Sequence, residues 1–329
     1  MHLNPRRRML LAVAAATTLP RAAGAQPAGR VFTVGTLSLA ALDPARPDAW
    51  QPFVAALREF NYVEGRNLVL KRAYGGGKPE RLADLAADLV RSRVDLIVTT
   101  GLTEARAAKQ ATSSIPIVMV FAPDPVGDGL VASLARPGGN VTGLTALVPG
   151  LRQKYVELLR EVVPSASRFG VIASSWNLRP ETLRELEAAA QVLGLRLSRV
   201  PVDGPDQFDA ALARARKEGV SGIIAIQDPL TQQHGRALAQ ALLKQRLPAI
   251  FWNRNYVDAG GLMTYSADLH DLYRRAAVYV DKIFRGAKPA DLPVEQPTKF
   301  ALVLNLKTAQ ALGLAIPYTV MIRATEVLE

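Results

Sequence analysis

Cysteine is absent from this chain of 329 residues. Its absence excludes disulfides, thiol nucleophiles, thiolate zinc sites and iron–sulfur clusters. A chain of this length can fold without disulfides, because its hydrophobic content of 49% is enough for a packed core. Histidine is also scarce, with three residues and no paired ligand motif. We therefore expect no metal and no cofactor.

Long apolar runs are missing as well. The run at residues 9–16 is too short to span a membrane, which takes about 20 residues. It follows three arginines at residues 6–8 and precedes the small residues Ala23-Gly24-Ala25. This succession is typical of a secretory signal peptide over residues 1–25. We expect cleavage near Ala25-Gln26 and export to the periplasm, by either the Sec or the twin-arginine route.

Acidic residues are fewer than basic ones, and the formal net charge is +11. Four of the arginines lie in the predicted signal peptide, which leaves about +7 for the rest of the chain. A high pI can indicate nucleic-acid binding. Here the basic residues are scattered and often stand beside acidic ones, as in residues 183–187, and they form no basic arm. The charge pattern therefore favours a solvated basic surface and no nucleic-acid partner.

Apolar runs alternate with helical patterns along the first half of the chain. Strands are expected at residues 31–39, 68–70, 95–101 and 115–121. Apolar residues at helical spacing predict helices between these strands, the first of them capped by Asp48. Continuous β-branched strands separated by helices indicate a parallel sheet that is covered on both faces.

The same order starts again near Arg168. Strands are expected at residues 168–173, 195–202, 222–226, 248–252 and 262–265. Helices are expected at residues 180–193 and 269–284, a third is expected to be capped by Asp206, and a fourth to end near Gln245. The repeated order predicts two similar α/β lobes that face each other across a cleft. Ligands of open α/β sheets bind outside the carboxyl ends of the strands, so candidate contacts are sought there.

Four segments carry a family resemblance. They are residues 115–118 (IPIV), 124–126 (DPV), 129–143 (GLVASLARPGGNVTG) and 297–309 (PTKFALVLNLKTA). They resemble signatures of the ABC-transporter substrate-binding family that includes the tryptophan-binding TrpX type. The resemblance covers essentially the whole chain after the signal peptide.

The resemblance implies the type I periplasmic binding protein fold. This is an α/β fold of two Rossmann-like lobes with parallel sheets, joined by a hinge that the chain crosses three times. By analogy, lobe one would hold residues 31–143 and 265–292, and lobe two would hold residues 144–264 and 293–329.

Two strand ends are followed by helix N-termini, where free N–H groups favour an anion. Thr100 and Gly101 end one strand, and Thr103 can cap the next helix or contact a ligand carboxylate. Asp228 repeats this arrangement in lobe two before Pro229. Its carboxylate can cap the helix or bind a ligand ammonium, and the sequence leaves both alternatives open.

Aromatic residues make up only 6% of the chain, yet four of them fall at or just beyond predicted strand ends. They are Phe121, Trp176, Trp252 and Tyr265. Together they indicate a ligand with a flat or apolar part, while each alone could simply pack at the rim. The remaining candidates at strand ends are polar: Ser38, Asp124, Asn177 and Asn253.

These observations predict a periplasmic solute-binding protein that acts as a monomer. It would capture an amino acid or a related carboxylate with an apolar or aromatic part, close around it, and deliver it to an ABC permease in the inner membrane. A sensory module that presents its closed form to a membrane receptor is the main alternative. A secreted enzyme is a weaker one, because the chain has no nucleophile elbow and no nucleophile–base or metal constellation.

Overall fold

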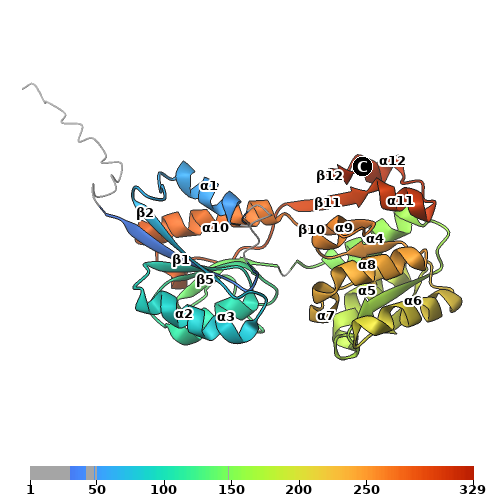
Figure 1. Ribbon diagram of the computed structural model, residues 1–329, viewed down its shortest axis with the longest axis horizontal. Helices are drawn as coiled ribbons and strands as arrows, with labels where there is room; N and C mark the ends of the chain where they lie inside the picture. The colour runs from blue at the N-terminus through green and yellow to red at the C-terminus, as the bar shows by residue number, and fades with distance from the viewer. Residues whose placement is uncertain (1–29, 42–47, 49, 147) are drawn as a thin grey trace, which may run out of the picture.

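The computed structural model describes residues 30–41, 48, 50–146 and 148–329. The predicted signal peptide, residues 1–25, lies outside these described residues. The chain folds into two α/β lobes that lie side by side and are joined by narrow connections (Figure 1). The predicted fold class, two lobes with mostly parallel sheets, is confirmed.

The first lobe is built on a five-stranded parallel sheet in the order β2-β1-β3-β4-β5. Its strands are β1 (Phe32–Ser38), β2 (Leu68–Tyr74), β3 (Leu96–Thr99), β4 (Ile117–Ala122) and β5 (Val141–Thr145). Its helices are α1 (Gln51–Glu59), α2 (Leu82–Arg91), α3 (Leu102–Ala111) and α10 (Leu269–Phe284). Helices α1 and α10 cover one face of the sheet and α2 and α3 the other, so its central strands are buried on both sides.

The second lobe is built on a seven-stranded sheet in the order β12-β11-β10-β9-β8-β6-β7. Its strands are β6 (Arg168–Ala173), β7 (Arg196–Pro201), β8 (Ile223–Ala225), β9 (Ala249–Phe251), β10 (Met263–Ala267), β11 (Phe300–Asn305) and β12 (Glu326–Leu328). Its helices are α4 (Leu151–Val162), α5 (Pro180–Val192), α6 (Phe208–Lys217), α7 (Pro229–Gln233), α8 (Gly235–Lys244), α9 (Asn255–Asp258), α11 (Leu306–Leu312) and α12 (Tyr318–Met321). All neighbouring strands pair in parallel except β10 and β11.

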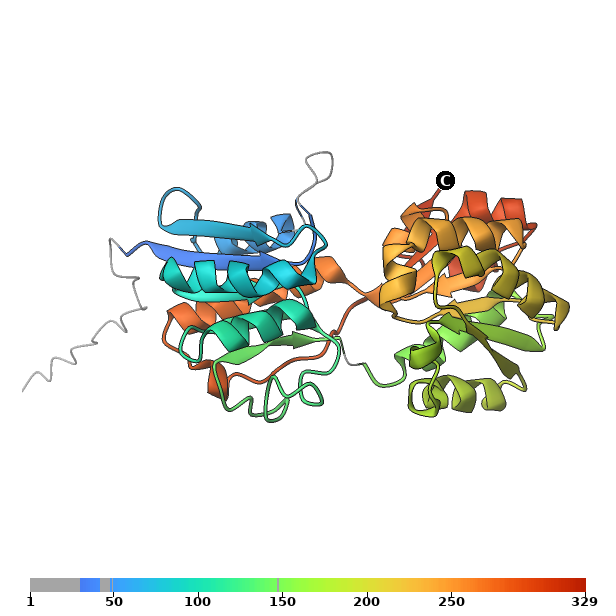
Figure 2. The ribbon, with the colours of Figure 1, turned by 60° about the horizontal axis from the view of Figure 1, so that its bottom comes forward.

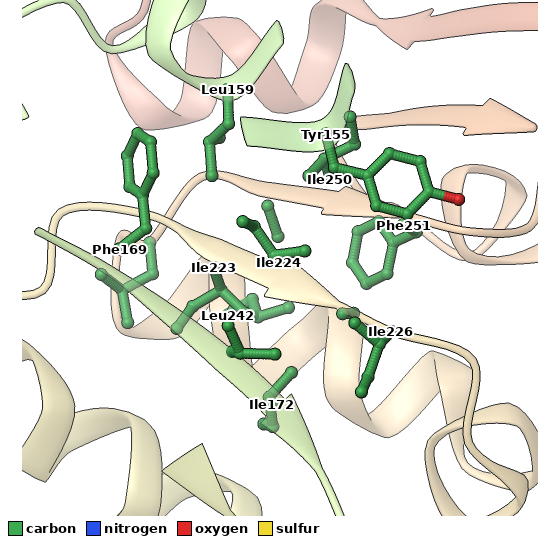
Figure 3. Packing of buried hydrophobic residues seen from close by; sticks show 14 of the residues in the cluster. Tyr155, Leu159, Phe169, Ile172, Ile223, Ile224, Ile226, Leu242, Ile250 and Phe251 are labelled. Carbon is green, nitrogen blue, oxygen red and sulfur yellow. The ribbon is translucent and has the colours of Figure 1, made fainter. Parts of the chain in front are cut away.

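The core of the second lobe lies between this sheet and its helices (Figure 3). Ile223 and Ile224 point to opposite faces of β8, and both are fully buried. Phe169 on β6 and Leu159 on α4 pack on the face opposite to Ile223, since a Cβ on Gly222 would lie 3.1 Å from both side chains. Burying such a side chain contributes roughly 1.5–3 kcal/mol to the stability of the fold. The sheet is therefore a rigid support for the loops that follow its strands.

The chain passes between the lobes three times (Figures 1 and 2). It leaves the first sheet at the end of β5 and enters α4. It returns from the end of β10 into α10, and it crosses again before β11. Because all strands of the first sheet run parallel to β5, their carboxyl ends share the edge from which the chain departs. Strands β6, β8 and β9 run parallel to β10, so their carboxyl ends also lie at a departing edge. We call these two edges the junction edges.

Backbone hydrogen bonds tie the crossings together. The N–H of Thr145 donates to the carbonyl of Glu295 at 3.0 Å, and the N–H of Glu295 donates to Gly143 at 3.0 Å. The N–H of Asp268 donates to the carbonyl of Lys299 at 3.0 Å. Gly143 has a φ of 126°, and a side chain there would place a Cβ 2.2 Å from the carbonyl oxygen of Met119. Only glycine therefore fits at this position of β5, two residues before the first crossing.

Strand membership differs by a few residues from the predicted lobe division. β5 continues to Thr145, β10 continues to Ala267, and Val294 packs in the core of the first lobe. The predicted division after residues 143, 264 and 292 stays a prediction about which parts move together.

Two expectations about helices of the second lobe are wrong. Asp206 does not cap α6, because residues Pro205–Gln207 form a short 3-10 turn and α6 starts at Phe208. The helix expected up to Gln245 is broken at His234 into α7 and α8. At the break a Cβ on Gly235 would lie 3.2 Å from the Tyr256 ring, so the chain bends around this aromatic side chain.

Candidate ligand-binding site

The junction edge of the first lobe carries six of the predicted contacts, Ser38, Thr100, Gly101, Thr103, Phe121 and Asp124. Ser38 is buried, and its hydroxyl accepts from the N–H of Ala40 at 3.2 Å. Gly101 is the N-cap of α3 and adopts an extended backbone, while Thr103 lies inside the first turn of this helix. The expectation that Thr103 caps α3 is therefore wrong, since the cap position is held by glycine and no side chain bonds there.

Thr100 does not stand free either. Its hydroxyl donates to the carboxylate of Glu104, three residues beyond the N-cap. The same Glu104 oxygen, Oε1, accepts from the N–H of Leu39 at 2.9 Å. Glu104 was missed by the sequence reasoning. The signal was present, because a glutamate at the third helical position after a cap is a capping-box position.

Phe121 and Asp124 follow at the end of β4. Phe121 is half-buried and packs against the core of the first lobe. Asp124 is exposed, and its Oδ1 accepts from the N–H of Gly127 at 2.9 Å in a local turn. This hydrogen bond supports the turn interpretation, and the other carboxylate oxygen also lies close to Gly127, 2.3 Å from where a Cβ on that residue would stand.

On the junction edge of the second lobe, Asp228 is fully buried. Its Oδ1 accepts from the N–H groups of Leu230 at 3.0 Å and Thr231 at 3.2 Å, and from the Ser174 hydroxyl at 2.9 Å. Its Oδ2 accepts from the N–H of Ser174 and the amide of Asn177, both at 3.2 Å. Of the two alternatives left open by the sequence, this geometry favours capping of α7.

The same hydrogen bonds hold the loop after β6. Asn177 binds Asp228, and Ser175 on the other side of Trp176 donates its N–H and hydroxyl to Asp203 at 3.0 and 2.6 Å. These two donors lower the pKa of Asp203, which therefore stays ionised. The loop between them presents the Trp176 side chain to solvent, with 58% of its surface exposed.

The other aromatic candidates do not join Trp176. Trp252 is buried in the core of the second lobe and meets Tyr256 edge to face, with ring centroids 6.2 Å apart. Burial raises the pKa of Tyr256 to about 12, so its hydroxyl stays protonated and can donate to Thr231. Tyr265 lies on β10 and stacks on Phe300 at 5.6 Å. The predicted aromatic set is thus spread over both lobes and one crossing strand.

Asn253 follows β9 and lines a polar cavity of about 300 Å³. Its Oδ1 accepts from the N–H of Asn255 at 2.8 Å. The cavity lies between the α7–α8 break and α9, and its other walls include Gln232, Arg236 and Tyr256.

An ion pair fixes the loop that carries Trp252 and Asn253. The guanidinium of Arg254 donates through both terminal nitrogens to Glu326 on β12, one of them at 2.6 Å. This pairing lowers the pKa of the Glu326 carboxyl. The C-terminal strand therefore braces the loop after β9, which no motif in the sequence indicated.

Two kinds of feature are absent from the described part of the chain. None of its histidine, aspartate and glutamate side chains form a group of three or more that could hold a metal ion. Over the same residues, no helix combines the length and apolar character needed to cross a bilayer.

Comparisons with known proteins agree with this architecture. A sequence model described as "ABC transporter substrate binding protein" matches residues 39–328. A "Tyrosine-binding protein" of Clostridioides difficile (strain R20291) is 24% identical over 272 residues, which are 82% of this chain and 78% of that protein.

Two solved structures are similar over 91% of this chain and 100% of their own. A conserved domain protein from Vibrio cholerae is 28% identical with a TM-score of 0.77. An ABC domain from Streptococcus pneumoniae in complex with L-Trp is 26% identical with a TM-score of 0.78. These findings confirm the resemblance to the TrpX type. The chain belongs to the ABC transporter substrate-binding protein family.

Proposed function

We propose that this protein is an exported solute-binding protein for an aromatic amino acid, or a related carboxylate with an apolar or aromatic part. It acts as a monomer, catalyses no reaction, and delivers its ligand to an ABC permease in the inner membrane. The observation that carries the proposal is the exposed indole of Trp176, held on a braced loop at a junction edge. Relatives described as binding tyrosine and L-Trp support the ligand class.

The proposed mechanism is closure of the two lobes about the three crossings. Closure would bring the two junction edges together and bury the ligand between them. The proposed site is formed by the predicted residues at these edges: Ser38, Thr100, Gly101, Thr103, Phe121, Asp124, Trp176, Asn177, Asp228, Trp252, Asn253 and Tyr265. Asp228 and Trp252 act from behind this surface, since both are buried in the second lobe. Export rests on the basic and apolar pattern of residues 6–25.

Micromolar binding corresponds to about 8 kcal/mol. Charge-assisted hydrogen bonds contribute roughly 1.5–3 kcal/mol each, and a buried ring adds to them. One buried ring and a few such hydrogen bonds therefore suffice for micromolar affinity, even after the free-energy cost of ordering the ligand.

We expect residues 26–329 to bind L-tryptophan or L-tyrosine with micromolar affinity or better in isothermal titration calorimetry. A panel of small amino acids and of sugars is the matched control, and we expect those ligands to bind at least tenfold more weakly. Binding of a sugar with no binding of any aromatic amino acid would contradict the proposed function.

A further inference from the structure

Glu104 is a carboxylate in an unusual place on the first junction edge. Only 6% of its surface is exposed, and it lies at the ends of two neighbouring strands, β1 and β3. Leu39 follows β1, Thr100 follows β3, and both donate to its Oε1. Within the described residues, its second oxygen, Oε2, accepts no hydrogen bond from another side chain or backbone group.

The charge of Glu104 is not matched by the protein. No lysine or arginine in the described residues forms an ion pair with it. The N-terminus of α3 supplies a partial positive charge, and two donors satisfy one oxygen. Oε2 is not one of the fully buried, unpartnered side-chain atoms of the described residues, so water reaches it in this arrangement. Closure of the lobes would remove that water, and a desolvated carboxylate is costly when it lacks a partner of opposite charge.

The free oxygen has an open approach. Oε2 lies 3.1 Å from the point where a Cβ on residue 101 would stand. That residue is glycine, so no side chain fills this space. Glycine is not required there by the backbone, since its φ of −142° is open to any residue. The missing side chain therefore leaves room for a small group at Oε2.

We propose that Glu104 binds the ammonium group of the ligand, an assignment that rests on the proposed function. A primary ammonium matches the missing positive charge and offers donors to a carboxylate oxygen. The two aspartates that the sequence singled out are less suited. Both oxygens of Asp228 are occupied, and Asp124 is exposed in a turn. The ligand carboxylate would then point away from α3, because Glu104 already places a negative charge at this helix N-terminus.

The test compares each amino acid with its des-amino analogue: L-tryptophan with 3-indolepropionate, and L-tyrosine with 3-(4-hydroxyphenyl)propionate. Wild type is expected to bind the amino acid at least tenfold more tightly than the analogue. Glu104→Gln keeps an oxygen for Leu39 and Thr100 but removes the charge. It should weaken the amino acid at least tenfold and change the analogue less than twofold.

A second variant guards against misfolding of the first. Gly101→Ala keeps the Glu104 carboxylate and fills the approach to Oε2. It should weaken the amino acid severalfold and spare the analogue, with an unchanged melting temperature. Two results would overturn the assignment while leaving the proposed function intact. One is an equal loss of affinity for the amino acid and its des-amino analogue in either variant, and the other is a Glu104→Gln variant that still prefers the amino acid as strongly as wild type does. Wild type that binds neither member would overturn the proposed function and the assignment with it.

Discussion

Replacing Trp176 with alanine is expected to weaken binding of L-tryptophan about 100-fold, which is about 2.7 kcal/mol. Trp176 exposes 58% of its surface in the two-lobe arrangement seen here, at the junction edge of the second lobe. Hydrogen bonds of Ser175 and Asn177 hold its loop, so the indole is positioned before the ligand arrives. Closure would bury the indole against an aromatic ligand, and alanine would lose most of that contact area. Calorimetric titration measures the loss directly.

Tyr318 provides the matched control for this prediction. It is an aromatic residue with 78% of its surface exposed, but it stands on α12, away from both junction edges. Tyr318→Ala should leave the affinity unchanged within twofold. Both variants should have the melting temperature of the wild-type protein, because neither side chain is part of a core. If Trp176→Ala binds L-tryptophan with an affinity within threefold of wild type, Trp176 does not contact the ligand.

Replacing Asp228 with alanine is expected to lower the free energy of unfolding by about 4 kcal/mol. The carboxylate accepts from five donors, which come from α7 and from the loop after β6. Alanine would leave several of these donors buried without a partner, at roughly 1–3 kcal/mol for each one that water cannot reach. The loop that carries Trp176 would lose its brace as well, so ligand affinity should fall together with stability.

The structure offers a second Asp-Pro pair as the control. Asp124 also precedes a proline after a buried strand, but it is exposed and accepts one hydrogen bond. Asp124→Ala should therefore lower the free energy of unfolding by no more than about 1 kcal/mol. Urea denaturation followed by circular dichroism measures both variants. Similar costs for Asp228→Ala and Asp124→Ala would show that burial and hydrogen bonding do not distinguish the two aspartates.

Much of the fold follows from hydrophobic patterning. The run around Ile223 reads as a strand because both of its faces are buried in a parallel sheet. The helix at Leu269–Phe284 was predicted with its observed bounds, and in the structure Asp268 caps it. The break at His234 could not be predicted in this way. It depends on the Tyr256 ring, which comes from a distant loop.

The site was predicted less completely, because strand ends identify residues but not their partners. Sequence placed Asp228 at a helix N-terminus, but only the fold brings Ser174 and Asn177 to its oxygens. Trp252 falls just after a strand and still packs inward. Glu104 stands at the third helical position after the cap, a capping-box spacing, but its burial and its contacts with Leu39 and Thr100 depend on the fold.

The central claim, capture of an aromatic amino acid between two closing lobes, is tested most directly by small-angle X-ray scattering of residues 26–329. The radius of gyration is measured without ligand and at saturation with the amino acid that binds most tightly in the calorimetric panel. Because the lobes touch mainly through three crossings, closure should reduce the radius of gyration measurably and to the same value at all saturating concentrations. A radius of gyration that stays unchanged at proven saturation would contradict this account.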